Sequence, residues 1–167
     1  RVVVDLLSII LSQDPLPALA SMRRAGYCIR PTIARTHQNM TEYRDQRLRS
    51  FHAKTPSFAH RVLIDSSAVV LGDVTLGDDV SVWPQAAVRG DMHRIEIGAR
   101  TSVQDGSILH ITHSGPFNAD GWPLIIGSDV IIGHGVILHG CTIGDRVLVG
   151  MGAIVMDGAV VESDVVI

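Results

Sequence analysis

The sequence predicts an all-β protein, a left-handed parallel β-helix whose coils each carry three short strands. An apolar residue returns every six positions along most of the chain, a period that neither an α-helix nor a simple alternating strand produces. Only 4% of the 167 residues are aromatic although 46% are apolar, so the core has to be aliphatic. Valine, isoleucine and leucine suit the pleated inner surface of such a solenoid. Each coil buries its core only against the coils above and below, which requires a sustained repeat of the kind seen here.

Taken in rotation from Ile64, the periodic residues define three sheets of inward-facing side chains. Neighbours within a sheet belong to successive coils and are expected about 4.8 Å apart. The first sheet holds Ile64, Val82, Val103, Ile132 and Val149, the second Val70, Val88, Leu109, Leu138 and Val155, and the third Leu76, Ile97, Ile126, Ile143 and Val161.

Two steps of the pattern are longer than six residues and predict loops that bulge at corners of the coil. The step Val88–Ile97 takes nine residues, and the step Leu109–Ile126 takes seventeen. The second insertion, about His113–Leu124, is rich in glycine, proline, asparagine and aspartate, which favour turns. We expect histidines to lie beside both corners.

The first 39 residues carry no six-residue pattern, which divides the chain in two. Residues 1–50 are predicted to be an N-terminal extension that is poorly ordered or partly non-native, with Met40 as an alternative start. Residues 51–167 are predicted to form the β-helix domain. Its last residue, Ile167, stands at an inward position. We therefore expect this domain to be incomplete at its C-terminal end, because solenoids normally close with a capping element.

Composition excludes several classes of function. A formal net charge of -3 offers no basic surface for nucleic acid. No apolar run approaches the roughly 20 residues that span a bilayer. The two cysteines, Cys28 and Cys141, form no CxxC motif, as expected of reduced thiols in a cytoplasmic protein. We therefore expect neither nucleic acid nor a membrane as a partner, and a cytoplasmic location.

Three histidines lie just after inward positions of the repeat. His110 and His139 each follow an inward leucine by one residue, so both stand in one column, one coil apart. Two imidazoles at that spacing can converge on one metal ion. His134 follows Ile132 by two residues and lies on another edge of the coil, too far round to join the pair within one chain. A third ligand from His134 would have to come from a neighbouring subunit.

The same lattice places a charged residue beneath each histidine column. Arg89 stands one coil below His110, and Asp105 stands one coil below His134. Where two subunits meet along these columns, Arg89 of one would face Asp105 of the next. That pairing would form an ion pair between subunits beneath the metal.

Three imidazole ligands would give a metal centre with an open coordination position. Catalytic zinc sites keep one tetrahedral position free in this way, whereas structural sites are closed. Bound zinc lowers the pKa of a water molecule to about 7, which supplies hydroxide at neutral pH. We therefore predict His110, His134 and His139 as ligands of Zn²⁺, with Fe²⁺ or Co²⁺ as alternatives that imidazole also suits.

Short motifs surround these histidines: Trp83-Pro84, Arg89-Gly90-Asp91, Val103-Gln104-Asp105-Gly106, Leu109-His110, Gly133-His134 and Leu138-His139-Gly140. Over about residues 51–167, the repeat and these motifs resemble the gamma-class carbonic anhydrases and their bacterial relatives among the hexapeptide-repeat proteins. The repeat alone is shared with many acyltransferases, whereas the Gln-Asp-Gly segment with three spaced histidines is specific.

This resemblance implies a role for each candidate residue. The three histidines match the metal ligands, two from one subunit and one from its neighbour in a trimer. Gln104 matches the residue that hydrogen-bonds the metal-bound hydroxide or bicarbonate. Arg89 matches an arginine that pairs across the interface, with Asp91 and Asp105 as its acidic partners. The resemblance therefore implies a homotrimeric lyase that binds zinc and reversibly hydrates CO₂ to bicarbonate.

The chain departs from the family's pattern in two places, and two other functions fit the same features. Ser102 stands where the archetypal enzymes have asparagine, and the loop after His110 keeps only Asp120 of an acidic, proton-shuttling loop. An acyltransferase or acyl-CoA thioesterase would use one histidine as a base in the same cleft between subunits, and it needs no stacked pair. A non-catalytic, metal-stabilised trimeric scaffold would retain all three ligands.

Overall fold

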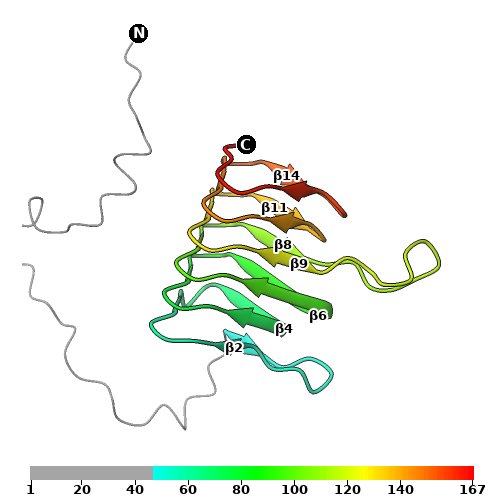
Figure 1. Ribbon diagram of the computed structural model, residues 1–167. Helices are drawn as coiled ribbons and strands as arrows, with labels where there is room; N and C mark the ends of the chain where they lie inside the picture. The colour runs from blue at the N-terminus through cyan, green and yellow to red at the C-terminus, as the bar shows by residue number, and fades with distance from the viewer. Residues whose placement is uncertain (1–46) are drawn as a thin grey trace, which may run out of the picture. The chain divides into compact units, whose positions relative to one another are not determined.

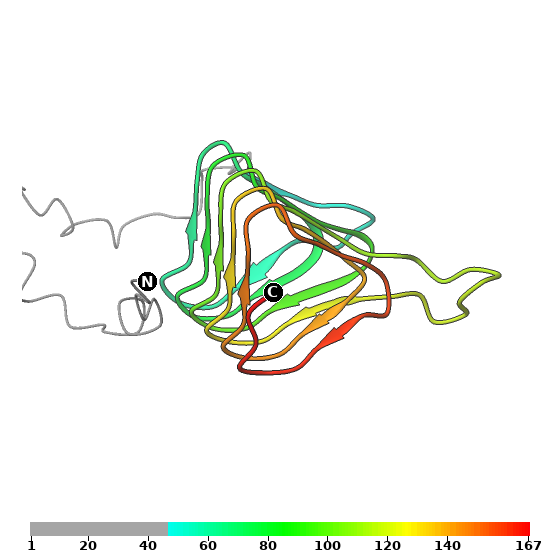
Figure 2. The same cartoon turned by 90° about the horizontal axis from the view of Figure 1, so that it is seen from above.

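The computed structural model describes residues 47–167, which form a left-handed parallel β-helix of stacked coils with a triangular cross-section (Figure 1, Figure 2). Only strands, bridges, bends and turns occur in this part of the chain. The fold class predicted from the six-residue repeat is confirmed. No described helix is long and apolar enough to cross a membrane. Met40, Cys28 and most of the predicted extension 1–50 lie outside the described residues.

The first face of the triangle, face one, is a parallel sheet of five two-residue strands in the order β13-β10-β7-β5-β3. Its register aligns Ile64 with Val82, Val82 with Val103, and so on through Ile132 to Val149, as the repeat predicts. The strands are β3 (Leu63–Ile64), β5 (Ser81–Val82), β7 (Ser102–Val103), β10 (Ile131–Ile132) and β13 (Leu148–Val149).

Face two and face three form one continuous sheet, whereas the sequence predicts three separate sheets. Two long strands, β4 (Val69–Leu76) and β6 (Ala87–Ile97), run along face two and on round the corner into face three. Face two continues with β8 (Ile108–His110), β11 (Ile137–His139) and β14 (Ile154–Val155), and face three with β9 (Leu124–Ile126), β12 (Thr142–Ile143) and β15 (Val160–Val161). At the start of the described chain, β1 (Leu48–Arg49) and β2 (Ser57–Phe58) both pair with β4. The predicted alignments within both faces are nevertheless confirmed.

The nine-residue step Val88–Ile97 lies within β6 and does not form the separate loop that the sequence predicts. The register between β4 and β6 shifts after Gly72, where the corner bulges. Gly72 has a φ of +81°, and a Cβ atom there would lie 2.2 Å from the carbonyl oxygen of Gly90. Only glycine fits this corner, because both the backbone angle and the close approach exclude a side chain. The bulge starts directly before Asp91.

The interior of the coils is mostly aliphatic. The residues that the repeat assigns to the middle coils, from Val70 to Val149, are almost completely buried. Two buried polar side chains are each satisfied by a backbone carbonyl: Thr101 Oγ1 donates to Gly127 at 2.9 Å and Ser107 Oγ to Gly133 at 2.9 Å. A core that carries no unsatisfied polar atom in the described residues leaves the chemistry to the outside of the coil.

The corner between face three and face one carries an ion ladder that the sequence analysis did not identify. Arginine and aspartate alternate there from coil to coil, and each arginine forms a two-pronged hydrogen bond with the aspartate of the next coil. All six residues have positive φ angles. The pairs are Arg61 with Asp79, Arg100 with Asp129, and Arg146 with Asp164.

Candidate metal centre

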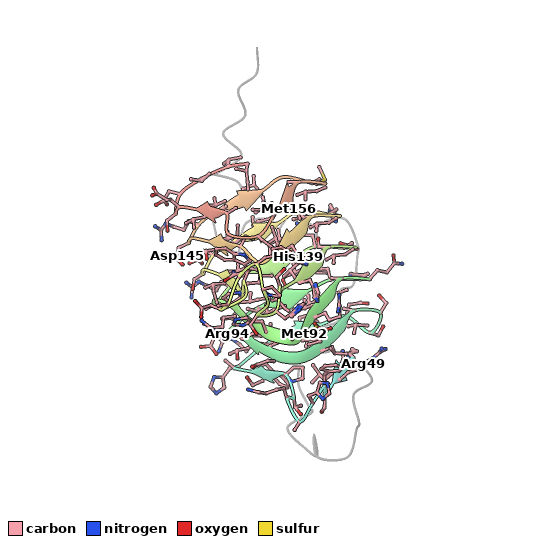
Figure 3. The ribbon with its side chains drawn as sticks, turned by 90° about the vertical axis from the view of Figure 1, so that its right-hand side faces the viewer. Arg49, Met92, Arg94, His139, Asp145 and Met156 are labelled. Carbon is pink, nitrogen blue, oxygen red and sulfur yellow. The ribbon has the colours of Figure 1, made fainter. Side chains whose placement is uncertain are left out.

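Two histidines face each other on the outside of face two. His110 ends β8 and His139 ends β11, and the parallel register aligns one directly with the other, as predicted. Their ring centroids are 5.0 Å apart, and Nδ1 of His110 lies 3.0 Å from Nε2 of His139. Figure 3 shows His139 on the side of the stack that carries Met92 below it and Met156 above it.

A carboxylate stands behind each of these two rings. Nε2 of His110 lies 3.0 Å from Oδ1 of Asp91, and Nδ1 of His139 lies 2.6 Å from Oδ1 of Asp157. An ionised carboxylate only accepts hydrogen bonds, so each ring must carry its proton on the nitrogen that faces the carboxylate. In the neutral rings, the lone pairs of His110 Nδ1 and His139 Nε2 therefore point toward one another.

The protonation states of the group follow from burial and hydrogen bonding. Burial opposes ionisation of Asp91 most strongly, but hydrogen bonds from His110 and Arg89 outweigh it and lower the pKa of Asp91. Burial likewise opposes ionisation of Asp157, and hydrogen bonds from His139 and Thr112 together lower its pKa. For His110, burial lowers the pKa below its ordinary value and prevails over the hydrogen bond to Asp91. At neutral pH the group therefore consists of two carboxylates and a neutral His110.

This pair fits two ligands of one divalent metal ion. Zinc–nitrogen bonds of 2.0–2.1 Å in a tetrahedral centre separate two ligand nitrogens by about 3.3 Å. The observed separation of 3.0 Å between His110 Nδ1 and His139 Nε2 is close to that value. Metal-bound histidines also typically donate their second ring N–H to a carboxylate, as both rings do here. Within residues 47–167 of one chain, no three His, Cys, Asp or Glu side chains form a group able to hold a metal. A third histidine from a second copy therefore stays a prediction.

The third predicted ligand, His134, stands at a different corner of the coil. Its Nδ1 lies 3.1 Å from Oδ2 of Asp105, and both side chains are about half exposed. Gln104 precedes Asp105 in the turn between β7 and β8 and is partly buried. In the described structure, no hydrogen bond or ion pair joins this group to His110 and His139. The chain thus presents two ligands at one corner and an exposed third at another.

Arg89 forms an ion pair within its own chain. Its guanidinium binds Oδ2 of Asp91, the carboxylate whose other oxygen faces His110. The alignment of Val88 with Leu109 places Arg89 directly below His110, as the lattice predicts. The expected pairing of Arg89 with Asp105 of a second copy stays a prediction, because the two lie at different corners of one chain.

The long insertion after His110 forms a hairpin that projects from the corner between faces two and three (Figure 2). Thr112 and Trp122 pair at its base, and Gly115 pairs with Asn118 near its tip. The backbone carbonyl of Asp120, the acidic residue of this loop, lies 3.2 Å from Nε2 of His93 on β6. Asp120 therefore stands beside His93 in a pocket at the root of the hairpin, together with Met92 and Ser114.

Comparison with known proteins places the chain in a family. No family model matches it. Protein YrdA of Escherichia coli is 59% identical over 110 residues, which are 66% of this chain and 60% of that protein. Gamma carbonic anhydrase 1, mitochondrial, of Arabidopsis thaliana is 39% identical over 72% of this chain and 43% of that protein. Carnitine operon protein CaiE of Escherichia coli is 39% identical over 71% of this chain and 57% of that protein.

The chain belongs to the gamma-carbonic-anhydrase-like hexapeptide-repeat family. A solved structure of a hexapeptide transferase family protein from Anaplasma phagocytophilum agrees with the fold, with a TM-score of 0.57 and 29% identity. That match covers 71% of this chain and 76% of the other. The gamma-carbonic-anhydrase-like chain spans less than two thirds of the length of the curated relatives named above.

In this gamma-carbonic-anhydrase-like chain, two residues of the site escaped the sequence analysis. Asp157 follows the inward Val155 by two residues and lies one coil above His139. Thr112 follows His110 by two residues and donates to Oδ2 of Asp157 at 2.7 Å. The six-residue repeat could have indicated both residues, because it places the polar residues that come just after inward positions of face two at one corner of the coil.

Proposed function

We propose that this protein is a metal-dependent carbonic anhydrase that reversibly hydrates CO₂ to bicarbonate at the interfaces of a homotrimer. The observation that carries the proposal is the 3.0 Å approach of His110 Nδ1 to His139 Nε2, with Asp91 and Asp157 behind the two rings. A relative in Arabidopsis thaliana is named as a gamma carbonic anhydrase, which supports the reaction class. The chain spans 43% of that relative, so the activity of the whole protein is part of the proposal.

The residues of the chain would divide the work between them. His110 and His139 supply two neutral nitrogen ligands, and His134 of a second copy supplies the third. Zn²⁺, or Fe²⁺ or Co²⁺ in its place, lowers the pKa of a coordinated water molecule to about 7 when bound in such a site. Gln104 directly precedes Asp105 in the chain. Its amide N–H would donate a hydrogen bond to the reacting oxygen and fix the orientation of that oxygen.

The surface next to the histidines supports self-association. Each strand of face two points one side chain outward two positions before the column of Arg89, His110 and His139. On successive coils these outward residues are aligned by the strand register, and every one of them is apolar: Val69, Ala87, Ile108, Ile137 and Ile154. We call this set the face-two ladder. Ile108 is 47% exposed and Ile154 is 62% exposed, so the ladder presents apolar area to its surroundings.

The corresponding positions of the other two faces differ in character. On face one they include Ser81 and Ser102, and on face three they include Thr75, Glu96 and Thr142. Only the face-two ladder is apolar on every coil and also adjoins the histidine pair. A second copy docked on face two would cover this area and bring its own exposed His134 toward the pair, which supports a trimer with sites at its interfaces.

The test is metal content and native mass, measured together on the full chain purified without oxygen. About one zinc or iron per chain in a trimer, with CO₂ hydration by the same preparation, is the expected result. His110→Ala should lose the metal and the activity. His60→Ala is the matched control, because His60 is an exposed histidine that pairs with Asp78 on another part of the coil. A His110→Ala protein that keeps its full metal content would contradict the proposal.

The same measurements separate the two other functions. A metal-free protein that turns over acyl-CoA esters would favour an acyltransferase or thioesterase, a class consistent with the hexapeptide transferase neighbour. A metal-loaded trimer that does not hydrate CO₂ would favour a non-catalytic scaffold. The paired rings and their two carboxylates argue against the first result, because an acyltransferase needs only one histidine, and the CO₂ hydration assay decides the second.

A further inference from the structure

Asp157 makes two hydrogen bonds that point in different directions. Its Oδ1 faces Nδ1 of His139 at 2.6 Å, and its Oδ2 accepts a hydrogen bond from Oγ1 of Thr112 at 2.7 Å. The side chain of Asp157 is 32% exposed and that of His139 is 27% exposed, so both groups are partly shielded from water. With both of its oxygens engaged, this carboxylate is held in one orientation.

Thr112 is itself fixed in place by the base of the hairpin. Its backbone N–H donates to the carbonyl of Trp122 at 3.0 Å, and the N–H of Trp122 donates back at 2.8 Å. The Trp122 side chain lies against Gly140, where an added Cβ would meet it at 2.7 Å and would meet Oδ1 of Asp157 at 2.5 Å. Gly140 has a φ of +54° and directly follows His139. The close packing at Gly140 thus leaves room for the aspartate only because this residue has no side chain.

We propose that Asp157, held by Thr112, is a positioning residue that fixes the tautomer and the direction of the His139 ring, so that Nε2 faces the metal position. The inference rests on the proposed function, because it assigns His139 as a metal ligand. It goes beyond that function by giving the terminal coil and the hairpin base a part in the site. Asp157 lies one coil above the ligand, and Thr112 comes from the insertion after the other ligand.

A carboxylate in this place stabilises the ligating form of the ring in two ways. It holds the proton on Nδ1, which leaves the lone pair on Nε2, and it restricts rotation of the ring about its χ2 bond. Asp91 does the same for His110 from the coil below. The two carboxylates bracket the pair, so each ring is oriented by a residue outside the pair and the two free nitrogens converge.

The experiment compares zinc affinity across four variants of the full chain, by competition with a chromophoric chelator. Asp157→Ala should weaken zinc binding about 10- to 100-fold, the usual effect of removing a partner of a metal-bound histidine. Asp157→Asn should recover part of that loss, because its amide oxygen still accepts from Nδ1–H. Thr112→Val should weaken binding by a smaller factor. Asp164→Asn is the matched control, since Asp164 lies on the same coil but pairs with Arg146.

A second readout does not depend on metal. Long-range ¹H–¹⁵N spectra of the histidine rings in the metal-free protein should show His139 with its proton on Nδ1. Asp157→Ala should convert this ring to a mixture of tautomers, and the control should not. Cooperative thermal unfolding, with melting temperatures close to that of the wild type, would establish that the variants remain folded.

The possible outcomes separate this inference from the proposed function. A wild-type protein that binds none of Zn²⁺, Fe²⁺ and Co²⁺ would overturn the function, and the ring spectra would then decide the role of Asp157 alone. Equal zinc affinities for the wild type and Asp157→Ala would overturn the inference while leaving the function in place. An unchanged His139 tautomer in Asp157→Ala would overturn it as well.

Discussion

Nδ1 of His110 and Nε2 of His139 lie 3.0 Å apart, although 29 residues separate the two histidines in the chain. The register of the β-helix produces this approach, because His110 and His139 are aligned partners on neighbouring strands. Parallel strands hold such partners at a fixed spacing along the whole stack. The long hairpin insertion between them leaves that alignment intact, because the hairpin projects from the corner of the coil (Figure 2).

If one metal ion joins these two rings, their contributions to its affinity are not independent. His110→Ala and His139→Ala should each lower zinc affinity strongly, and the loss in the double variant should be smaller than the sum of the two single losses. The reason is that both rings bind the same ion, so once one ring is removed the other contributes less to an affinity that is already reduced. Chelator competition on the two single variants and the double variant measures this. Losses that add up fully in the double variant would show that each ring binds a separate ion.

The face-two ladder predicts where self-association can be broken. Ile108→Glu should lower the native mass from trimer to monomer, because it places a charge in an apolar interface beside His110. The circular dichroism of the coil should remain unchanged, since Ile108 points outward and is 47% exposed. Val160→Glu, on the outer side of face three and 70% exposed, is the control and should keep the native mass. A trimeric Ile108→Glu protein would move the interface to another face.

The ion ladder at the corner between face three and face one predicts a loss of stability in acid. Hydrogen bonds from Arg61, Arg100 and Arg146 lower the pKa values of Asp79, Asp129 and Asp164 in the folded chain. Groups with a lowered folded-state pKa stabilise the fold above their unfolded pKa of about 3.9, and that contribution is lost as the pH falls through the folded values. The urea concentration at the unfolding midpoint should therefore decrease as the pH is lowered from about 5 to about 2.

A triple variant isolates the ladder from the other carboxylates. Replacing all three ladder aspartates with asparagine, which also tolerates positive φ angles, keeps the backbone and removes the charges. This variant should have a lower urea midpoint at pH 7 and a smaller decrease on acidification than the wild type. An acid-induced decrease equal to that of the wild type would assign it to carboxylates elsewhere, such as Asp91 and Asp157.

The sequence predicted the inward lattice because core geometry leaves little freedom. An aliphatic residue every sixth position has to face the interior, so Leu109 and Leu138 had to align, and with them His110 and His139. The contacts between outward-facing side chains could not be predicted from the repeat. Periodicity does not show that Asp157 turns toward His139, or that Arg100 and Asp129 adopt positive φ angles and pair across a 29-residue separation. Such contacts depend on side-chain rotamers and on the path of the corner, which six-residue spacing does not specify.

The continuity of faces two and three was missed for a similar reason. The pattern marks where inward residues fall but not whether the backbone between them stays extended. In β6 the chain remains extended across the corner, and the extra residues after Gly90 bulge beside β4. The two glycines Gly72 and Gly90 make this possible, because each occupies a place where a Cβ would collide with the other strand.

Cys141 provides a chemical probe of the coil that carries His139. Its side chain is 1% exposed, and burial raises its pKa to about 11. Iodoacetamide reacts with thiolates, so at pH 8 the native protein should be alkylated at Cys141 far more slowly than a free thiol, and only when the coil opens. Peptide mass spectrometry separates this site from Cys28.

Leu138→Ala should cost about 2–5 kcal/mol of stability and accelerate the reaction, because it removes a fully buried side chain from the same coil. Ile108→Ala, which trims an outward side chain, should leave the rate near that of the wild type. Equally rapid alkylation of the native protein and of a free thiol would show that this coil is open in solution, and the histidine pair could not then hold its 3.0 Å geometry.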